Sequence, residues 1–251
     1  MKNLEIKKSK NLGINFILLI VFAIHLFAIL MVYLDSDFFY LKYPLFSLLD
    51  SYFATALIIN PIIISSVVKK VIEIEEKNNM WDLQLSLGLK IPTILVNKFK
   101  NLSFKFFILQ IVEWIIIITL SYQNNDFIIN SEITKRIIIY FLSELFINLS
   151  MISIFIIIEM RSKKVYFSLF FSIIGAMSGI ICMFTSNLLS QINPFALFST
   201  LLNINYIKNG SGFIQMPYNI NYFTILISFI YLSISVIYLI KNKKYILNKE
   251  I

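Results

Sequence analysis

The chain has 251 residues, a net charge of +8 and a mean hydropathy of +0.80, and 58% of its residues are apolar. The apolar residues come in blocks, several of them longer than the roughly 20 residues needed to cross a bilayer, which excludes an ordinary soluble domain and predicts an integral membrane protein. One cysteine and one histidine exclude a disulfide framework within the chain and disfavour a metal site, so we expect no metal or cofactor on this chain.

Six apolar segments are predicted to cross the membrane as helices, because lipid offers the backbone no hydrogen-bond partners. The first is expected to be a retained span rather than a removed signal peptide, since no small-residue cleavage site follows it. The prediction is therefore an all-α protein with a single six-helix transmembrane domain. The predicted spans are residues 13–34, 47–68, 103–120, 137–158, 165–184 and 222–240.

The positive charge is expected to set the orientation. Most of the 22 Lys and Arg residues fall in the N-terminal tail, the loop at 69–102, the loop after residue 158 and the C-terminal tail. The opposite side carries few: Lys42, Lys135, Arg136 and Lys208. By the positive-inside rule both termini are cytoplasmic. The charge is explained by topology, so nucleic acid is not an expected partner.

The single histidine of the chain lies inside a predicted span. His25 lies in the middle of span one, where it either forms a neutral polar contact between helices or bonds a carboxylate across the bundle.

The segment at 72–100 is charged, although it lies between two apolar spans. From Met80 its apolar and polar residues alternate, which is typical of a strand. A helix is predicted instead, because a lone strand beside a membrane has no sheet to join. Pro92 is expected to break the chain before span three. Two interpretations are open: a solvated loop with Trp81 at the interface, or a docking element for a cytoplasmic partner.

Two acidic residues lie inside the predicted spans. Glu113 lies near the middle of span three, and Glu144 lies in span four with Asn148 one turn further on the same face. A carboxylate is costly in lipid and usually faces the bundle interior. Either each is protonated or bonded to a neighbour such as Gln110 or Asn148, or both line a path that attracts a cationic molecule.

Two further features concern span five and the loop after it. Gly175 and Gly179 form a small-xxx-small motif that permits close approach, within the chain or, less favoured, between subunits. The outer loop at 185–221 contains an apolar run at 194–202 that is too short to span. It is expected to lie as a short helix at the outer membrane surface.

The segment at 72–100 resembles the first cytoplasmic loop of ABC-2 type exporter permeases, and residues 4–10, LEIKKSK, resemble the start of that family. The chain length and the NNMW element at 78–81 are most similar to permease subunits of lantibiotic immunity transporters. Residues 88–90, Gly-Leu-Lys, depart from the family's more usual Pro, Ser and Arg. The residues that carry the resemblance are Glu73, Glu76, Asn78, Asn79, Trp81, Leu83, Leu85, Pro92 and Lys98.

The resemblance implies the ABC-2 (type II exporter-like) architecture in a bacterial plasma membrane, with both termini inside. It implies a separate ATP-binding subunit that uses ATP and Mg²⁺, a second permease subunit, like or unlike, and an amphipathic, cationic peptide as substrate. This chain has no G-x-x-x-x-G-K-[ST] phosphate loop and is not expected to be an enzyme. The implied docking residues are Glu73, Glu75, Glu76, Asn78, Asn79, Trp81, Asp82 and Leu85; the transport-path candidates are His25, Glu113, Glu144 and Asn148.

The sequence also bears on three alternative functions. A membrane-embedded protease is disfavoured, because Met80 stands where the E-E-x-x-x-R motif begun by Glu75 and Glu76 needs Arg, and no His follows. An immunity protein that binds peptide without ATP stays open. An ABC-2 permease for another amphiphile, such as a bacitracin-like peptide or a drug, also stays open.

Overall fold

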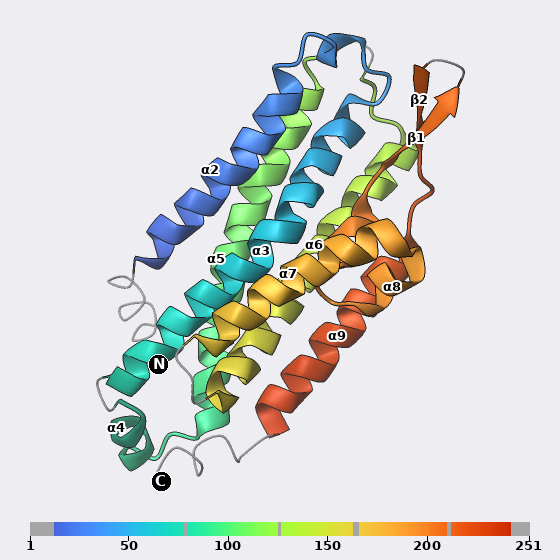
Figure 1. Cartoon of the computed structure of the whole chain (residues 1–251). Coiled ribbons are helices and arrows are strands. Elements are labelled where there is room, and N and C mark those ends of the chain that lie inside the picture. Colours follow the sequence, from blue (N-terminus) through green and yellow to red (C-terminus); the bar gives the residue numbers. More distant parts are fainter. Residues whose placement is uncertain (1–12, 78–79, 125–126, 163–165, 210–211, 242–251) are drawn as a thin grey trace.

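The computed structural model describes residues 13–77, 80–124, 127–162, 166–209 and 212–241. Within these ranges six helices are long and apolar enough to cross a membrane, which confirms the prediction of a mostly helical, multi-pass membrane protein. They run together in one elongated bundle (Figure 1). In chain order they are α2 (Ile14–Tyr33), α3 (Pro44–Lys77), α5 (Ile91–Ser121), α6 (Ser131–Arg161), α7 (Phe167–Thr185) and α9 (Tyr222–Lys241).

Three of these helices are much longer than the predicted spans. At 1.5 Å per residue, the 34 residues of α3 extend about 51 Å, against ~30 Å for the hydrocarbon core. The helices α5 and α6 have 31 residues each. Most of the predicted loop at 69–102 is therefore helical, because α3 continues to Lys77 and α5 already begins at Ile91. Apolar length marks only the part suited to lipid, whereas a helix's own hydrogen bonds carry it on into water.

A short helix, α4 (Met80–Ser86), joins α3 to α5 and confirms that this segment is helical despite its alternating pattern. Gly88 follows it with a φ of 76°, a left-handed conformation that glycine adopts without a steric penalty. Pro92 was expected to break the chain, but it lies in the first turn of α5, where its missing N–H costs nothing. The break itself lies between Ser86 and Ile91.

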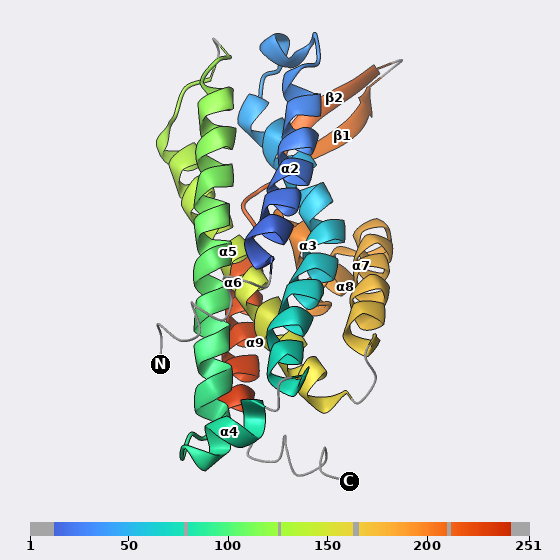
Figure 2. The same ribbon diagram turned by 90° about the vertical axis from the view of Figure 1, so that its left-hand side faces the viewer.

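The other end of the bundle carries a β-hairpin (Figures 1 and 2). Strands β1 (Ile204–Asn209) and β2 (Gly212–Pro217) pair antiparallel, with Ile204 opposite Pro217. A 3₁₀ turn, η1 (Phe38–Tyr40), also lies at this end, between α2 and α3. The hairpin was not foreseen, because its strands are short and lie within a polar loop.

The apolar run at 194–202 is not a helix at the membrane surface. After α8 (Asn187–Ile192) the chain forms a 3₁₀ helix, η2 (Leu197–Leu201), that contacts α3, α6, α7 and α9. The side chains of Leu197, Phe198 and Leu201 are fully buried. The run is too short to cross a bilayer, but it buries its apolar residues by folding back into the bundle, which offers closer packing than the interface does.

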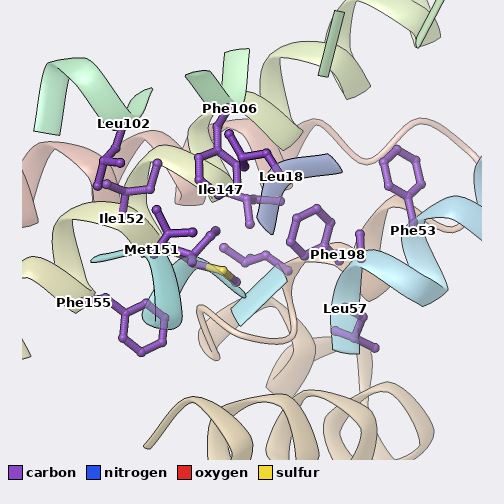
Figure 3. Close-up of a cluster of buried hydrophobic side chains, with 14 of the residues drawn as sticks. Leu18, Phe53, Leu57, Leu102, Phe106, Ile147, Met151, Ile152, Phe155 and Phe198 are labelled. Carbon is purple, nitrogen blue, oxygen red and sulfur yellow. The ribbon is translucent and has the colours of Figure 1, made fainter. Parts of the chain in front are cut away.

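The core of the bundle forms around α6, which packs against α3, α5, α7, α9 and η2. Figure 3 shows Phe198 of η2 among side chains of α3 and α6, including Leu57 and Met151. In lipid such packing holds helices together through van der Waals contact, since leaving the lipid for the bundle gains little hydrophobic energy.

The two glycines of α7 are used within the chain. A Cβ atom at Gly175 would lie 2.8 Å from the Phe195 ring, and one at Gly179 would lie 2.8 Å from the Phe195 backbone oxygen and 3.1 Å from Leu57 Cδ1. Because these glycines have no side chain, Phe195, just before η2, packs directly against α7. The geometry therefore agrees with the intramolecular use of the motif that the sequence favoured.

Adding one methyl group at this seat tests the packing. We expect Gly179→Ala to lower the free energy of unfolding by about 1–3 kcal/mol, because the backbone of Phe195 must move to admit it. The measurement is an SDS titration of the protein in mixed micelles. Met177→Ala, on the exposed side of the same helix, serves as the control and should change stability by less than ~0.5 kcal/mol. Equal stability of Gly179→Ala and wild type would contradict this packing.

Candidate functional site

Five buried side chains from four helices form a hydrogen-bonded group, which we call the interior cluster: His25 of α2, Tyr52 of α3, Glu113 and Trp114 of α5, and Glu144 of α6. His25 Nδ1 lies 2.7 Å from Glu113 Oε1, and the Tyr52 hydroxyl lies 2.8 Å from Glu113 Oε2. The same hydroxyl is hydrogen-bonded to Glu144 Oε1. Trp114 Nε1 donates to Glu144 Oε2 over 2.6 Å. Each side chain is at most 3% exposed.

The cluster brings together three of the four transport-path candidates. His25 bonds a carboxylate across the bundle, as one of the two interpretations of that residue expected. Asn148 lies outside the cluster and accepts a hydrogen bond from Asn60 Nδ2 at 3.2 Å. Both carboxyl groups are buried and face neighbouring helices.

Sequence reasoning missed Tyr52 and Trp114, the residues that connect the two acids. Both lie in apolar stretches, and aromatic residues are common in such stretches for packing alone. The expected partners of the acids were Gln110 and Asn148. Gln110 does face Glu144, and its Nε2 also donates to the Phe141 backbone oxygen at 2.8 Å. Pairings 30 to 92 residues apart in sequence leave no local signal in the chain.

A second polar group fixes α4 against α3 and α5, and we call it the α4 anchor: Glu75, Gln84 and Lys98. Lys98 Nζ lies 2.7 Å from Glu75 Oε1 and 3.2 Å from the Val71 backbone oxygen. Gln84 Nε2 donates to Glu75 Oε2 over 2.6 Å. The ion pair is buried, with Glu75 0% and Lys98 1% exposed. The Glu75 carboxylate of α3 thus links α3 to α4 and to α5.

The α4 anchor changes the predicted docking set. Glu75 and Trp81 were expected to face a partner, but both side chains are buried inside the chain. Trp81 is apolar and Glu75 is paired with Lys98, so both side chains are stable when buried against the ends of α3 and α5. Of the other docking candidates, Glu76 and Asp82 are exposed, Glu73 and Leu85 are half-buried, and Asn78 and Asn79 lie outside the described residues.

Two leucines on the outer side of α4 are absent from the predicted docking set. Leu83 is 52% exposed and Leu87, one turn later, is 71% exposed, with Asp82 beside them. The signal that could have found them is their spacing of four residues, which places both leucines on one helical face. Two exposed leucines at a polar end of the bundle are a candidate contact for another protein.

A third group holds the hairpin end, and we call it the outer anchor: Asp50, Arg136, Asn203 and Tyr218. Asp50 accepts hydrogen bonds from the backbone N–H groups of Asn203 at 2.6 Å and Ile204 at 2.9 Å. Arg136 donates to Asn203 Oδ1 at 3.2 Å and to the Tyr218 backbone oxygen at 2.7 Å. Arg136 was read only as an outer-loop charge and Asp50 was not considered, yet together they tie the base of the hairpin to α3 and α6.

Comparisons of the chain with protein-family models, with curated proteins and with solved structures find no match. The functional argument therefore comes from the three polar groups. The interior cluster joins α2, α3, α5 and α6, the α4 anchor links α3, α4 and α5, and the outer anchor secures the hairpin at the opposite end.

Breaking the α4 anchor on one side only should be costly. We expect Lys98→Met to lower the free energy of unfolding by about 3–5 kcal/mol, because Glu75 stays buried without that ammonium group. Replacing both charges, as Glu75→Leu with Lys98→Met, should restore most of the loss.

The measurement is again an SDS titration in mixed micelles. Lys100→Met is the matched control, since Lys100 is exposed two residues away and should change stability by less than ~0.5 kcal/mol. A Lys98→Met protein as stable as Lys100→Met would show that the buried pair does not hold α4.

Proposed function

We propose that this chain is the membrane-spanning permease subunit of an ATP-driven exporter of the ABC-2 type, which expels a lantibiotic or a similar cationic antimicrobial peptide from the membrane of the producing bacterium. ATP and Mg²⁺ are used by a separate ATP-binding subunit, and a second permease, like or unlike, completes the transporter. The observation that carries the proposal is α4, a short helix fixed between two long membrane-spanning helices.

Charge supports the orientation in this proposal. Among the described residues, the end of the bundle that carries α4 also carries Lys69, Lys70, Lys90, Lys98, Lys100, Arg161 and Lys241, whereas the basic residues of the hairpin end are Lys42, Lys135, Arg136 and Lys208. By the positive-inside rule the α4 end faces the cytoplasm, which is where ATP is available. The exposed pair Leu83 and Leu87 then faces a cytoplasmic partner.

The α4 anchor explains how such a partner would act on the membrane part. Glu75 belongs to α3 and Lys98 to α5, and Gln84 of α4 bonds Glu75, so α4 cannot move without at least one of the long helices. A push on Leu83 and Leu87 would thus be passed to α3 and α5 as movement of packed elements.

Both α3 and α5 reach the interior cluster. Tyr52 lies on α3, about six turns from Glu75, and Glu113 lies on α5, about four turns from Lys98. In α3, Pro61 lies between the two levels and lacks the N–H that would complete the helical ladder. The α5 segment from Lys98 to Glu113 contains no proline, so α5 is the stiffer of the two helices.

The cargo is assigned from chemistry and from the resemblance. Opening the interior cluster would present two carboxyl groups, Glu113 and Glu144, to a path through the bundle. Carboxylates in a low-dielectric interior attract cations. A cationic, amphipathic peptide fits such a path, and another amphiphile carrying positive charge would fit the same groups.

Peptide tolerance tests the whole proposal. Cells expressing this permease with its neighbouring ATP-binding subunit are challenged with a panel of lantibiotics, next to cells whose ATP-binding subunit has lost its phosphate-loop lysine. We expect protection in the first strain and none in the second, because transport needs ATP hydrolysis. The readout is the minimal inhibitory concentration of each peptide.

Two results would contradict the proposal in different ways. Protection that survives in the strain with the inactive ATP-binding subunit would indicate an immunity protein that binds peptide without ATP. Absence of protection against every lantibiotic, with ATP-dependent protection against bacitracin-like peptides or drugs, would keep the exporter and change its cargo.

The docking surface is tested separately. We expect Leu83→Asp with Leu87→Asp to abolish co-purification of the ATP-binding subunit, because two carboxylates replace the apolar contact that the partner covers. Ser86→Ala, an exposed position between them, is the control and should retain the partner. The partner's presence is measured in detergent extracts by affinity capture of the permease. Full retention by the double variant would place the contact elsewhere on the chain.

A further inference from the structure

The hydrogen bonds of the interior cluster require more hydrogens than its ordinary ionisation states supply. A tyrosine hydroxyl carries one hydrogen and can donate it to one acceptor. The Tyr52 hydroxyl is bonded to Glu113 Oε2 and to Glu144 Oε1 at the same time. If both carboxyl groups were ionised, one of these contacts would set two oxygen atoms against each other without a hydrogen between them. One carboxyl group must therefore supply the second hydrogen.

The remaining contacts do not remove this requirement. Trp114 Nε1 already donates its single hydrogen to the other oxygen of Glu144. On the Glu113 side, His25 Nδ1 contacts Oε1, the oxygen that does not touch Tyr52. In the part of the chain that the structure describes, no Lys or Arg forms an ion pair with either glutamate.

The groups that face the two carboxyls can be named for each helix. His25 comes from α2, Tyr52 from α3, Trp114 and Gln110 from α5, and Glu144 faces Glu113 from α6. The histidine supplies a second observation: its Nε2 atom is buried and, among the described residues, has no hydrogen-bond partner. If Nε2 carried a hydrogen as well, it would be a buried donor without an acceptor. The second hydrogen that the cluster needs is therefore not on His25 Nε2.

We propose that the interior cluster is a proton-binding site in the membrane, in which Glu113 and Glu144 share one proton through Tyr52. In one arrangement Glu144 carries the proton and donates to the Tyr52 oxygen, while Tyr52 donates to the Glu113 carboxylate. In the other, Glu144 has passed its proton to the Tyr52 oxygen and Tyr52 has passed its own hydrogen to Glu113. One O–H bond forms for each that breaks, so the number of protons is the same in both.

This site concerns how the bundle is held closed, whatever its cargo. The shared proton joins α5 to α6 through α3, and it keeps two carboxylates from standing unscreened beside each other in lipid. Separating those helices breaks the shared arrangement and leaves one carboxyl as a neutral acid. Opening at this level is thereby linked to the position of one proton.

Infrared spectroscopy of the purified full chain in lipid nanodiscs tests the proposal at neutral pH. The C=O stretch of a protonated glutamic acid is expected in the wild type, and it should move when the protein is made with ¹³C-labelled glutamate. Glu113→Gln and Glu144→Gln should each abolish that band. With one carboxylate left, the Tyr52 hydrogen suffices and no acid proton is needed.

Two controls keep the test decisive. Glu159 is a partly buried glutamate outside the interior cluster, so the experiment is repeated in a Glu159→Gln background, where the interior cluster is intact and the band should persist. Glu132→Gln, at an exposed position of α6, should also keep it.

The outcomes separate cleanly. Absence of a glutamic-acid band from the folded Glu159→Gln protein overturns the proposal even if the other variants fail to fold. Persistence of the band in either Glu113→Gln or Glu144→Gln shows that the proton belongs to one residue alone and overturns sharing. Neither the ATP-binding subunit nor a cargo enters the measurement, so its result is independent of the proposed transport function.

Discussion

The cost of placing carboxyl groups inside a bilayer determines how this bundle is assembled. Glu113 and Glu144 can stay there only because they bond to each other through Tyr52 and to His25 and Trp114. These partners come from α2, α3, α5 and α6, so satisfying two acids aligns four of the six long helices at one level. The apolar packing around α6 then has a fixed register, which van der Waals contacts between similar apolar side chains would specify less sharply.

Two other polar groups hold the two ends of the bundle. At one end the pair of Glu75 and Lys98 joins α3, α4 and α5, and at the other Asp50 and Arg136 secure the base of the hairpin. A buried pair of this kind adds little net stability over apolar packing, but it tolerates few alternative arrangements. Each group therefore specifies position more than it adds free energy, and α4 and the hairpin are held in defined places.

The connection between α4 and the interior cluster bears on the proposed mechanism. Both are built on α3 and α5, which are continuous helices from the α4 end to the level of the interior cluster. The transporter proposed above, whose motor is another protein, needs such a connection, because energy released outside the membrane must change a barrier within it. In that proposal the exposed Leu83 and Leu87 and the carboxyl cluster are the two ends of the connection.

The sequence by itself determined the six spans, the helical state of the segment at 80–86 and the three polar residues His25, Glu113 and Glu144 that do not belong in lipid alone. Those features follow from local properties: apolar length, backbone hydrogen bonding and the cost of a charge. Only the tertiary structure decided that Tyr52 and Trp114 join the acids, that Trp81 and Glu75 turn inward, and that the run at 194–202 folds into the bundle. The partners in each case lie on different helices, and which faces meet depends on the packing of the whole bundle, a property that no single segment of the chain carries.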